Sequence, residues 1–447
     1  MLIQASKLYF MIKCIGIFAG LMACCFHAVA QTPFYPGNLV VYRIGDGSDT
    51  LSSAGFPVFA DEFTTSGSAV ASHPLPTTIN GLNRRIVASG SATSEGMISR
   101  STDKAFLLVT GYDTFPDPNR SSISGSQATL INRVVGLFGA DGSIDSRTAL
   151  ADAYNGSNIR GAVSTNGTDI WITGTGSPVG TAGIRYVTRG ATTSLQLSTT
   201  VTNIRNGGLF NNQLYCTSGS GAFKGISAVG TGMPTTAGQT ITVLPGFPNT
   251  SAAGPDPYAF EINPTGTIAY VADGRSKAAG GGVQRWDYNG ASWSLSYTLD
   301  SGLTLGVRYL TVDWSNSNPV IYAVTSDAIV KNQPGNRIVK TTDTDSLSAF
   351  VAIAQAGANT VYRGICFTPE GGTSITYTFT GNGNWTDPAN WSGNTVPPNP
   401  LLSGHVVIDP VIGGQCVVNL DQTIGSLAKF TVMTGKKLII PGNLIVL

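Results

Sequence analysis

The chain has 447 residues, of which 42% are hydrophobic and 11% are charged, with 26 basic and 25 acidic side chains. This composition is too apolar for a disordered chain, and the near-neutral balance provides no basic surface for nucleic acid or anionic membranes. With 55 glycines, 23 prolines and no window of sustained helical periodicity, it predicts an all-β protein, and the length suggests two domains.

The first 30 residues resemble a cleavable signal peptide. Lys7 and Lys13 form a basic start, and the apolar run from Ile15 to Phe26 is too short for a stable membrane anchor. Ala28-Val29-Ala30 is a small-x-small cleavage site, so we expect residues 1–30 to be removed and the mature chain to begin at Gln31. The protein is therefore expected to be secreted, either extracellular or on the cell surface.

Two other locations stay open, the periplasm and a lipid-anchored state. Leu21-Met22-Ala23-Cys24 also fits a lipoprotein box, and a lipid on Cys24 would tether the chain to a membrane. No later segment reaches the roughly 18 apolar residues of a membrane helix. Three cysteines remain after cleavage, and we expect them to be buried and unpaired, with a disulfide as the alternative: Cys216, Cys366 and Cys416.

One phrase recurs along the chain: a short apolar strand, a polar turn and a second apolar strand. The turns fall near residues 102, 165, 211, 264, 317 and 369. A spacing of about 50 residues suits the four-stranded blades of a β-propeller. Weaker strand signals between the phrases, such as 134–138, predict the outer strands of each blade.

The two ends of this repeat complement each other. The sixth phrase has an inner strand but no second strand, while 39–44 and 58–63 are strands without an inner partner. We expect 361–368 to pair with 38–45, which closes a ring and removes exposed sheet edges. This predicts six blades, or seven if Arg84 to Ala88 is a degenerate blade rather than an outer strand.

The opening segment 37–67, GNLVVYRIGDGSDTLSS followed by VFADEFTTSG, and the segment SATSEGMISRS at 91–101 resemble a group of exported bacterial propeller proteins of unassigned function. The repeats are similar, in a broad sense, to the YVTN or lactonase-type propellers of bacteria. The resemblance covers residues 31–372. It implies a propeller and leaves the activity open, because propellers include enzymes, binding proteins and scaffolds.

Residues 373–447 follow a different pattern. Trp385, Asn390 and Trp391 form a W-x-x-x-x-N-W motif that resembles segments of large bacterial surface proteins, where it opens a β-solenoid or a small β-domain. Short, closely spaced strands follow, so we expect a small solenoid-like region, and the abrupt end suggests a truncated version of a longer design. We expect both tryptophans to anchor a core, with stacking on sugar rings as the alternative.

The sharpest candidate site consists of the residues that open the inner strands. In a propeller these strands line the central channel, so their first residues surround one mouth of it. Arginine suits bidentate capture of carboxylate or phosphate, and four arginines in a partly desolvated funnel would attract an anion. The six residues are Glu95, Arg160, Arg205, Tyr258, Arg308 and Arg363.

These residues have a purely structural interpretation as well. Each arginine could bond carbonyl groups in the loop of the neighbouring blade and hold the ring together. Glu95 could orient one arginine, or it could act as a general base with a raised pKa. The sequence leaves both interpretations open.

Other catalytic constellations are missing from the sequence. The mature chain has two histidines in different regions, His73 and His405, and no zinc motif, paired CxxC or phosphate loop. We therefore expect no metal and no cofactor. Structural calcium is a minor alternative, because aspartates cluster near two turns: Asp141, Asp145 and Asp152 at one, Asp343 and Asp345 at the other.

Two functions remain open. The first is a binding or surface-interaction module, whose partner is an anionic small molecule, an acidic glycan or another surface protein. The second is a lactonase-type or lyase-type enzyme that uses the funnel lined by arginine and glutamate. The missing histidines and metal ligands favour a non-enzymatic role, and the sequence does not decide between the two.

Overall fold

The computed structural model describes residues 32–250, 254–327, 330–370 and 376–446. In these ranges the chain is almost entirely β-structure, and its helices are four single turns: η1 (Val179–Thr181), η2 (Lys277–Ala279), η3 (Pro388–Asn390) and η4 (Ser392–Asn394). No helix among these residues is long and apolar enough to cross a membrane. The predicted all-β class is confirmed, whereas residues 1–30, with the expected signal peptide, lie outside the described residues.

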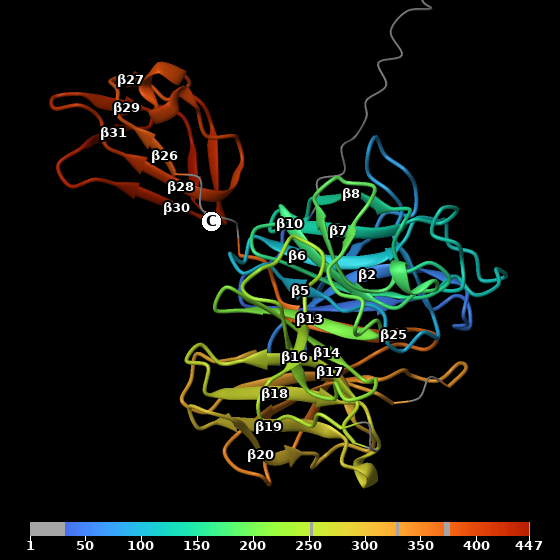
Figure 1. The fold of residues 1–447 in the computed structure, drawn as a ribbon. Helices are drawn as coiled ribbons and strands as arrows, with labels where there is room; N and C mark the ends of the chain where they lie inside the picture. The colour runs from blue at the N-terminus through green and yellow to red at the C-terminus, as the bar shows by residue number, and fades with distance from the viewer. Residues whose placement is uncertain (1–31, 251–253, 328–329, 371–375, 447) are drawn as a thin grey trace, which may run out of the picture. The chain divides into compact units, whose positions relative to one another are not determined.

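Four antiparallel sheets of four strands each form propeller-like blades (Figure 1). Within each sheet, strands that are consecutive in the chain pair with each other, as the recurring phrase predicted. The first two sheets are β9 (Ile159–Ser164), β10 (Asp169–Gly174), β11 (Gly183–Thr188) and β12 (Leu195–Gln196), then β13 (Ile204–Phe210), β14 (Gln213–Ser218), β15 (Ile226–Val229) and β16 (Ile241–Val243). The next two are β17 (Pro257–Ile262), β18 (Ile268–Asp273), β19 (Gly282–Tyr288) and β20 (Trp293–Leu299), then β21 (Val307–Asp313), β22 (Val320–Thr325), β23 (Arg337–Thr342) and β24 (Val351–Gln355).

A larger sheet joins the beginning of the described chain to the last inner strand. Its order is β25-β1-β2-β4-β6-β7-β8, with β3 on β2 and β5 on β6. The strands are β1 (Leu39–Ile44), β2 (Gly55–Phe63), β3 (Ala69–Pro74), β4 (Val87–Ser89), β5 (Ser99–Arg100), β6 (Phe106–Tyr112), β7 (Arg133–Gly139), β8 (Ile144–Leu150) and β25 (Val361–Phe367). Leu39 pairs with Phe367 and Ile44 with Val361, so the predicted pairing of 38–45 with 361–368 is confirmed.

The segment Arg84 to Ala88, which could have belonged to a seventh blade, overlaps the three-residue strand β4. This strand pairs with both β2 and β6. It therefore connects two groups of four strands, β25-β1-β2-β3 and β5-β6-β7-β8, within the larger sheet.

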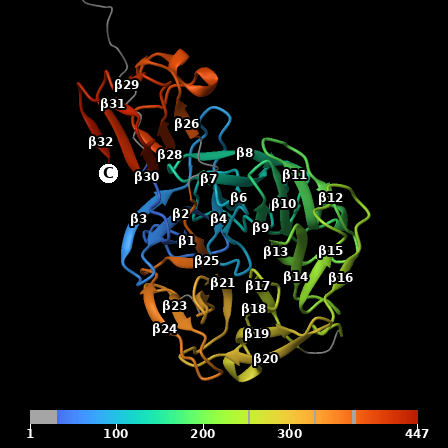
Figure 2. The same cartoon turned by 90° about the vertical axis from the view of Figure 1, so that its left-hand side faces the viewer.

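The inner strands of the sheets lie next to one another in chain order. Strand β5 neighbours β9, followed by β13, β17, β21 and β25, and β25 in turn neighbours β5. Figure 2 shows the sheets around a common centre, with β9, β13, β17, β21 and β25 nearest to it. Burial differs among these strands: all six residues of β9 are buried, whereas only two of the seven residues of β13 are.

The C-terminal strands pair in parallel, unlike those of the blades. One sheet has the order β26 (Thr376–Phe379), β28 (Leu401–Ile408), β30 (Gln422–Val432) and β32 (Leu444–Val446), and a second contains β27 (Gly383–Asn384), β29 (Gln415–Val417) and β31 (Lys437–Ile439). Trp385 and Trp391 pack edge to face in the core between them, and the Trp391 indole donates a hydrogen bond to the Trp385 carbonyl at 2.7 Å. Their prediction as core anchors is confirmed.

The three cysteines of the predicted mature chain are buried and unpaired, as the sequence analysis expected. Cys216 lies in β14, Cys366 in β25 and Cys416 in β29. Burial raises the pKa of each thiol to about 12, so all three are neutral near pH 7. They act as small apolar side chains in the cores.

Candidate functional site

The predicted arginines and Tyr258 stand at the beginnings of inner strands, as the repeat implied. Arg160, Arg205, Tyr258 and Arg308 are each the second residue of their strand, and Arg363 is the third of β25. We call these five residues together with Glu95 the arginine ring.

Glu95 differs from the expectation, because the predicted strand 95–100 is reduced to Ser99–Arg100 and Glu95 lies in the loop before it. The reason is Gly96, whose φ of 78° turns the chain. A side chain there would lie 2.8 Å from the Tyr42 ring and 2.9 Å from Arg363 Cβ. The turn places Glu95 beside the arginines without extending the strand.

Three arginines of the arginine ring donate hydrogen bonds to residues outside the ring. Arg160 donates to the Ile204 carbonyl at 2.8 Å, at the start of the next inner strand, and to Oδ1 of Asn203, the residue before that strand, at 2.5 Å. Arg205 donates to Asp256 Oδ1 at 3.0 Å. Three arginines therefore reach toward the next blade, because Arg363 also donates to the Gly90 carbonyl at 3.4 Å.

Tyr258 separates two of the cations. The guanidinium carbon of Arg205 lies 4.2 Å from the centre of the Tyr258 ring, and that of Arg308 lies 5.4 Å from it. Contact with an aromatic face partly compensates for the desolvation of a cation. Among the described residues none accepts a hydrogen bond from Arg308, which lies over the Tyr258 ring.

The Glu95 carboxylate already has three hydrogen-bond donors within the protein. It accepts hydrogen bonds from the Tyr112 hydroxyl at 2.6 Å, the Asn158 amide, and the Ser89 backbone N–H at 3.2 Å. Burial raises the pKa of Glu95, while these hydrogen bonds and Arg363 lower it. A carboxylate with three donors is better suited to orient the loop than to accept a proton from a substrate.

The four arginines share one further property. Each has a buried Nε–H without a hydrogen-bond partner within the described part of the chain. Arg160 and Arg363 are only 6% and 3% exposed, so water reaches them poorly. Such donors are costly to bury without an acceptor.

Charge repulsion between the arginines adds to the cost of burying them. Burial, followed by the neighbouring Arg205, lowers the pKa of Arg160 to about 10. Burial also lowers the pKa of Arg363, with a contribution from Arg308. Four guanidinium groups thus gather around two carboxylates, those of Glu95 and Asp256, and a third anion would reduce the repulsion.

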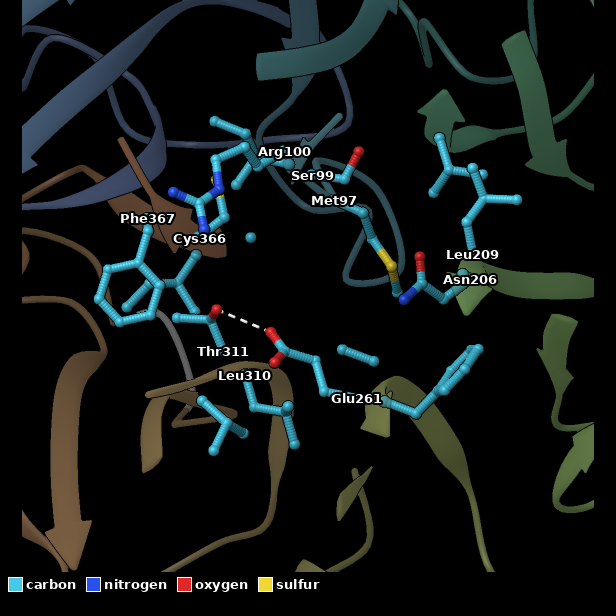
Figure 3. Close-up of a pocket in the computed structure, with 18 of the residues that line it drawn as sticks. Met97, Ser99, Arg100, Asn206, Leu209, Glu261, Leu310, Thr311, Cys366 and Phe367 are labelled. Atoms are coloured by element: carbon cyan, nitrogen blue, oxygen red, sulfur yellow. Dashed lines mark hydrogen bonds between the residues drawn. The ribbon is translucent and has the colours of Figure 1, made fainter. Parts of the chain in front are cut away.

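A cavity of about 420 Å³ lies among the opposite ends of the inner strands, where the sequence analysis placed no site. Figure 3 shows Glu261, Arg100, Asn206 and Thr311 around it, together with apolar side chains. Glu261 Oε1 accepts a hydrogen bond from Thr311 Oγ1 at 2.7 Å, and its Oε2 accepts one from Trp314 Nε1 at 3.2 Å. Burial raises the pKa of Glu261 to about 7, although both hydrogen bonds and Arg100 lower it.

Glu261 was visible in the sequence but not selected. It is the one charged residue in the strand Pro257–Ile262, and that isolation was the available signal. The sequence analysis considered only the first residue of each inner strand, so it did not examine the residues farther along these strands that line the cavity.

The remaining candidates lie elsewhere. His73, in β3, has its Nε2 3.6 Å from Glu62 Oε2 and packs on Phe34, while His405 bonds Thr431 in the C-terminal sheets. The predicted calcium ligands are engaged within the protein: Asp141 with Ser143, Asp145 with Arg147 and Arg189, Asp152 with Arg185, Asp343 with Arg285 and Tyr297, and Asp345 with Leu347. Among the described ranges, no three His, Cys, Asp or Glu side chains gather in a way that could hold a metal ion.

No protein-family model matches the chain, and no curated protein sequence matches it. Among solved structures it is similar to the periplasmic gluconolactonase of Pseudomonas aeruginosa, with 11% identity and a TM-score of 0.42 over 71% of this chain and 83% of that one. It is also similar to a GH74 enzyme from Niastella koreensis (14% identity, TM-score 0.39, 78% and 47% covered) and to the propeller domain of the Trilobed protease from Pyrococcus furiosus (9%, 0.33, 72% and 84%). Similarity at this level carries no information about activity.

Proposed function

We propose that the protein is an exported binding module that holds a small carboxylate or an acidic sugar at the arginine ring. The observation that carries this proposal is the set of four buried, unpartnered Nε–H groups, one on each arginine of the ring. A carboxylate can accept from two guanidinium groups at once, and it would also lower the repulsion between them.

The architecture that we propose for this module is a closed propeller of six blades. The order of neighbouring inner strands supports it, because β5, β9, β13, β17, β21 and β25 follow one another and β25 returns to β5. The two four-stranded groups joined through β4 would be the first and the sixth blade. For the C-terminal region we propose a small β-solenoid, since its parallel strands stack as successive rungs do.

The proposal that the protein is exported is supported by the first 30 residues, whose basic start, short apolar run and small-x-small site fit a signal peptide. On this proposal the module acts outside the cytoplasm, where acidic glycans and surface proteins are available partners. The C-terminal region would then act as a spacer or an attachment element.

A calorimetric titration with galacturonate tests the binding. We expect saturable binding that weakens with added salt, because part of the attraction is screened charge. Arg308→Ala should weaken it by about 1.5–3 kcal/mol, the usual contribution of a charged hydrogen bond. It should leave the melting temperature nearly unchanged, since Arg308 donates no hydrogen bond to a described residue.

Two variants serve as controls for this titration. Arg84→Ala removes an arginine outside the ring whose side chain has no hydrogen bond within the described chain, and it should bind like the wild type. Arg160→Ala should lose both affinity and stability, because Arg160 also bonds Asn203 and Ile204. If wild-type protein shows no galacturonate binding while Arg308→Ala lowers the melting temperature, the ring is a structural device and the proposal is wrong.

The alternative function is an enzyme that works in the same funnel with Glu95 as its base. The raised pKa of Glu95 favours it, whereas the three hydrogen bonds to its carboxylate oppose it. Turnover of a uronate or a lactone by the wild type and its loss in Glu95→Gln would establish this alternative in place of simple binding.

A further inference from the structure

None of the six arginine-ring residues lines the cavity at the opposite ends of the inner strands, and many of the side chains that line it are apolar. Met97 lines it from the loop before β5, Leu209 from β13, Phe260 from β17, and Ile365 and Phe367 both from β25. Its volume of about 420 Å³ lies within the range of ligand pockets. Such walls favour a ligand with an apolar body.

A few polar groups converge on this apolar space, as Figure 3 shows. Arg100 donates through Nη1 to the Thr368 carbonyl at 3.2 Å and to Glu370 at 3.0 Å. Its Nε and Nη2, like the side-chain amide of Asn206, have no hydrogen-bond partner within the described part of the chain. Arg100 and Asn206 thus provide hydrogen-bond donors to the cavity, and Glu261 provides a carboxyl group.

The charges around the cavity nearly cancel. Arg100 and Lys104 both pair with Glu370, so these three side chains carry a net charge of one positive unit. Ionised Glu261 would balance that charge. The other titratable groups that line the cavity are neutral, because burial raises the pKa of Tyr309 and of Cys366 to about 12. With Glu261 protonated the cavity is therefore cationic, and with Glu261 ionised it is neutral.

We propose that this cavity is a second binding site, for small carboxylic acids with an apolar body, in which Glu261 takes up a proton as the ligand binds. The protonated Glu261 donates a hydrogen bond to the ligand carboxylate, and Arg100 pairs with the same carboxylate. The apolar body packs against Phe260 and its neighbours. No bond is broken, and the proton that Glu261 gains comes from solvent.

The pKa of about 7 for Glu261 supports this coupling, because only part of the population holds the proton at neutral pH. A bound carboxylate raises the pKa further through like-charge repulsion. Affinity should therefore increase about tenfold between pH 8 and pH 6, the change that follows from one proton taken up by a group with that pKa.

Benzoate is the probe, titrated into the full chain at pH 6 and pH 8. At pH 8, repeating the titration in buffers with different ionisation enthalpies should show uptake of close to one proton. Glu261→Gln remains a neutral hydrogen-bond donor, so it should bind benzoate with the same affinity at both pH values and take up no proton. Benzoate is also a carboxylate that the arginine ring could bind, and Arg308→Ala weakens that binding, so the same titrations of Arg308→Ala should still show the pH dependence and thereby assign it to the cavity.

Glu370→Gln is the matched charge control. It releases Arg100 and Lys104 from their shared carboxylate, so benzoate should bind more tightly at both pH values with the pH dependence retained. Thr311→Val removes one hydrogen bond to Glu261 and should shift the midpoint of the pH dependence upward.

Three results would overturn the inference. Wild-type protein could bind benzoate equally at pH 6 and pH 8, Glu261→Gln could retain the pH dependence, or benzylamine could bind more tightly than benzoate. The last result would identify the cavity as a cation site held by ionised Glu261.

Discussion

The arginines of the ring have structural contacts and, on our proposal, also bind a ligand. Arg160, Arg205 and Arg363 each donate one hydrogen bond or more toward the next blade, which fixes the spacing of the inner strands. Their Nε–H groups remain unpartnered in the described chain, so the same side chains keep capacity for a ligand. Arg308 is the member with the least structural commitment, and it is therefore the most informative position for mutation.

The positions of these residues could be predicted because the repeated phrase gives the start of each inner strand. Their contacts could not, since Arg160 reaches Asn203 and Arg205 reaches Asp256, both remote in the sequence. The environment of Glu261 was equally hidden. Its raised pKa depends on burial beside Thr311 and Trp314, some 50 residues away along the chain.

Glu261 should also affect how stability depends on pH. Its pKa is about 7 in the folded protein against an ordinary value of 4.5, so the folded state binds the proton more tightly than the unfolded state. The free energy of unfolding therefore falls as pH rises from about 4.5 to about 7 and levels off above that. Because Glu261→Gln cannot titrate, its melting temperature should rise relative to the wild type across this window, by about 2–4 °C for each kcal/mol involved.

Thermal melts at pH 4.5, 6, 7 and 8 measure this difference. Glu370→Gln, which removes a half-exposed carboxylate of the same type, should keep the pH profile of the wild type. Parallel profiles for wild type and Glu261→Gln would show that Glu261 titrates normally and would contradict the account.

At the scale of elements, β5 shows what a hydrophobic sequence pattern cannot predict. The apolar phrase at 95–100 predicted a full inner strand, but Gly96 adopts a positive φ and only Ser99–Arg100 remain in β5. The hydrophobic pattern does not report backbone conformation. Pairing at the ends was easier to predict, because strands without partners at both ends of the repeat had to find each other.

The closure between β1 and β25 can be tested with a single new cysteine. Val40 lies opposite Cys366, and both side chains belong to the same core cluster. Opposite residues in an antiparallel pair are close enough for a disulfide, so Val40→Cys should oxidise with Cys366. The link would close a loop of more than 300 residues, for which the chain-entropy contribution is about 5–6 kcal/mol.

We expect this variant to melt several degrees higher than the wild type, with the gain lost on reduction. Thiol titration in denaturant should show that Cys366 is no longer free. Val41→Cys is the control, because Val41 pairs with Ile365 and belongs to a different core cluster. A free Cys366 in oxidised Val40→Cys would mean that the two strands do not pair as described.

For the whole molecule, most of the architecture could be predicted from the repeated sequence phrase. A spacing of about 50 residues predicts propeller blades, and the inner strands of consecutive repeats lie next to one another. The C-terminal region was less predictable, because short apolar segments indicate strands but not their direction. There the strands pair in parallel in two sheets, around a core that contains Trp385 and Trp391.

The assembly of separate strands around one channel creates a property that no single strand has. Four arginines that are spread over some 200 residues of sequence stand at the beginnings of neighbouring inner strands, each with a buried, unpartnered Nε–H in the described chain, and Arg205 and Arg308 lower the pKa values of Arg160 and Arg363. This arrangement is the basis of the proposed function, and the proposal predicts a bound anion there.

Anomalous diffraction from crystals soaked in bromide tests that consequence most directly. The account predicts an anomalous peak within hydrogen-bonding distance of guanidinium groups of the arginine ring in the wild type, and a weaker peak or none in Arg308→Ala. Bromide peaks elsewhere on the protein, with none among Arg160, Arg205, Arg308 and Arg363, would contradict it.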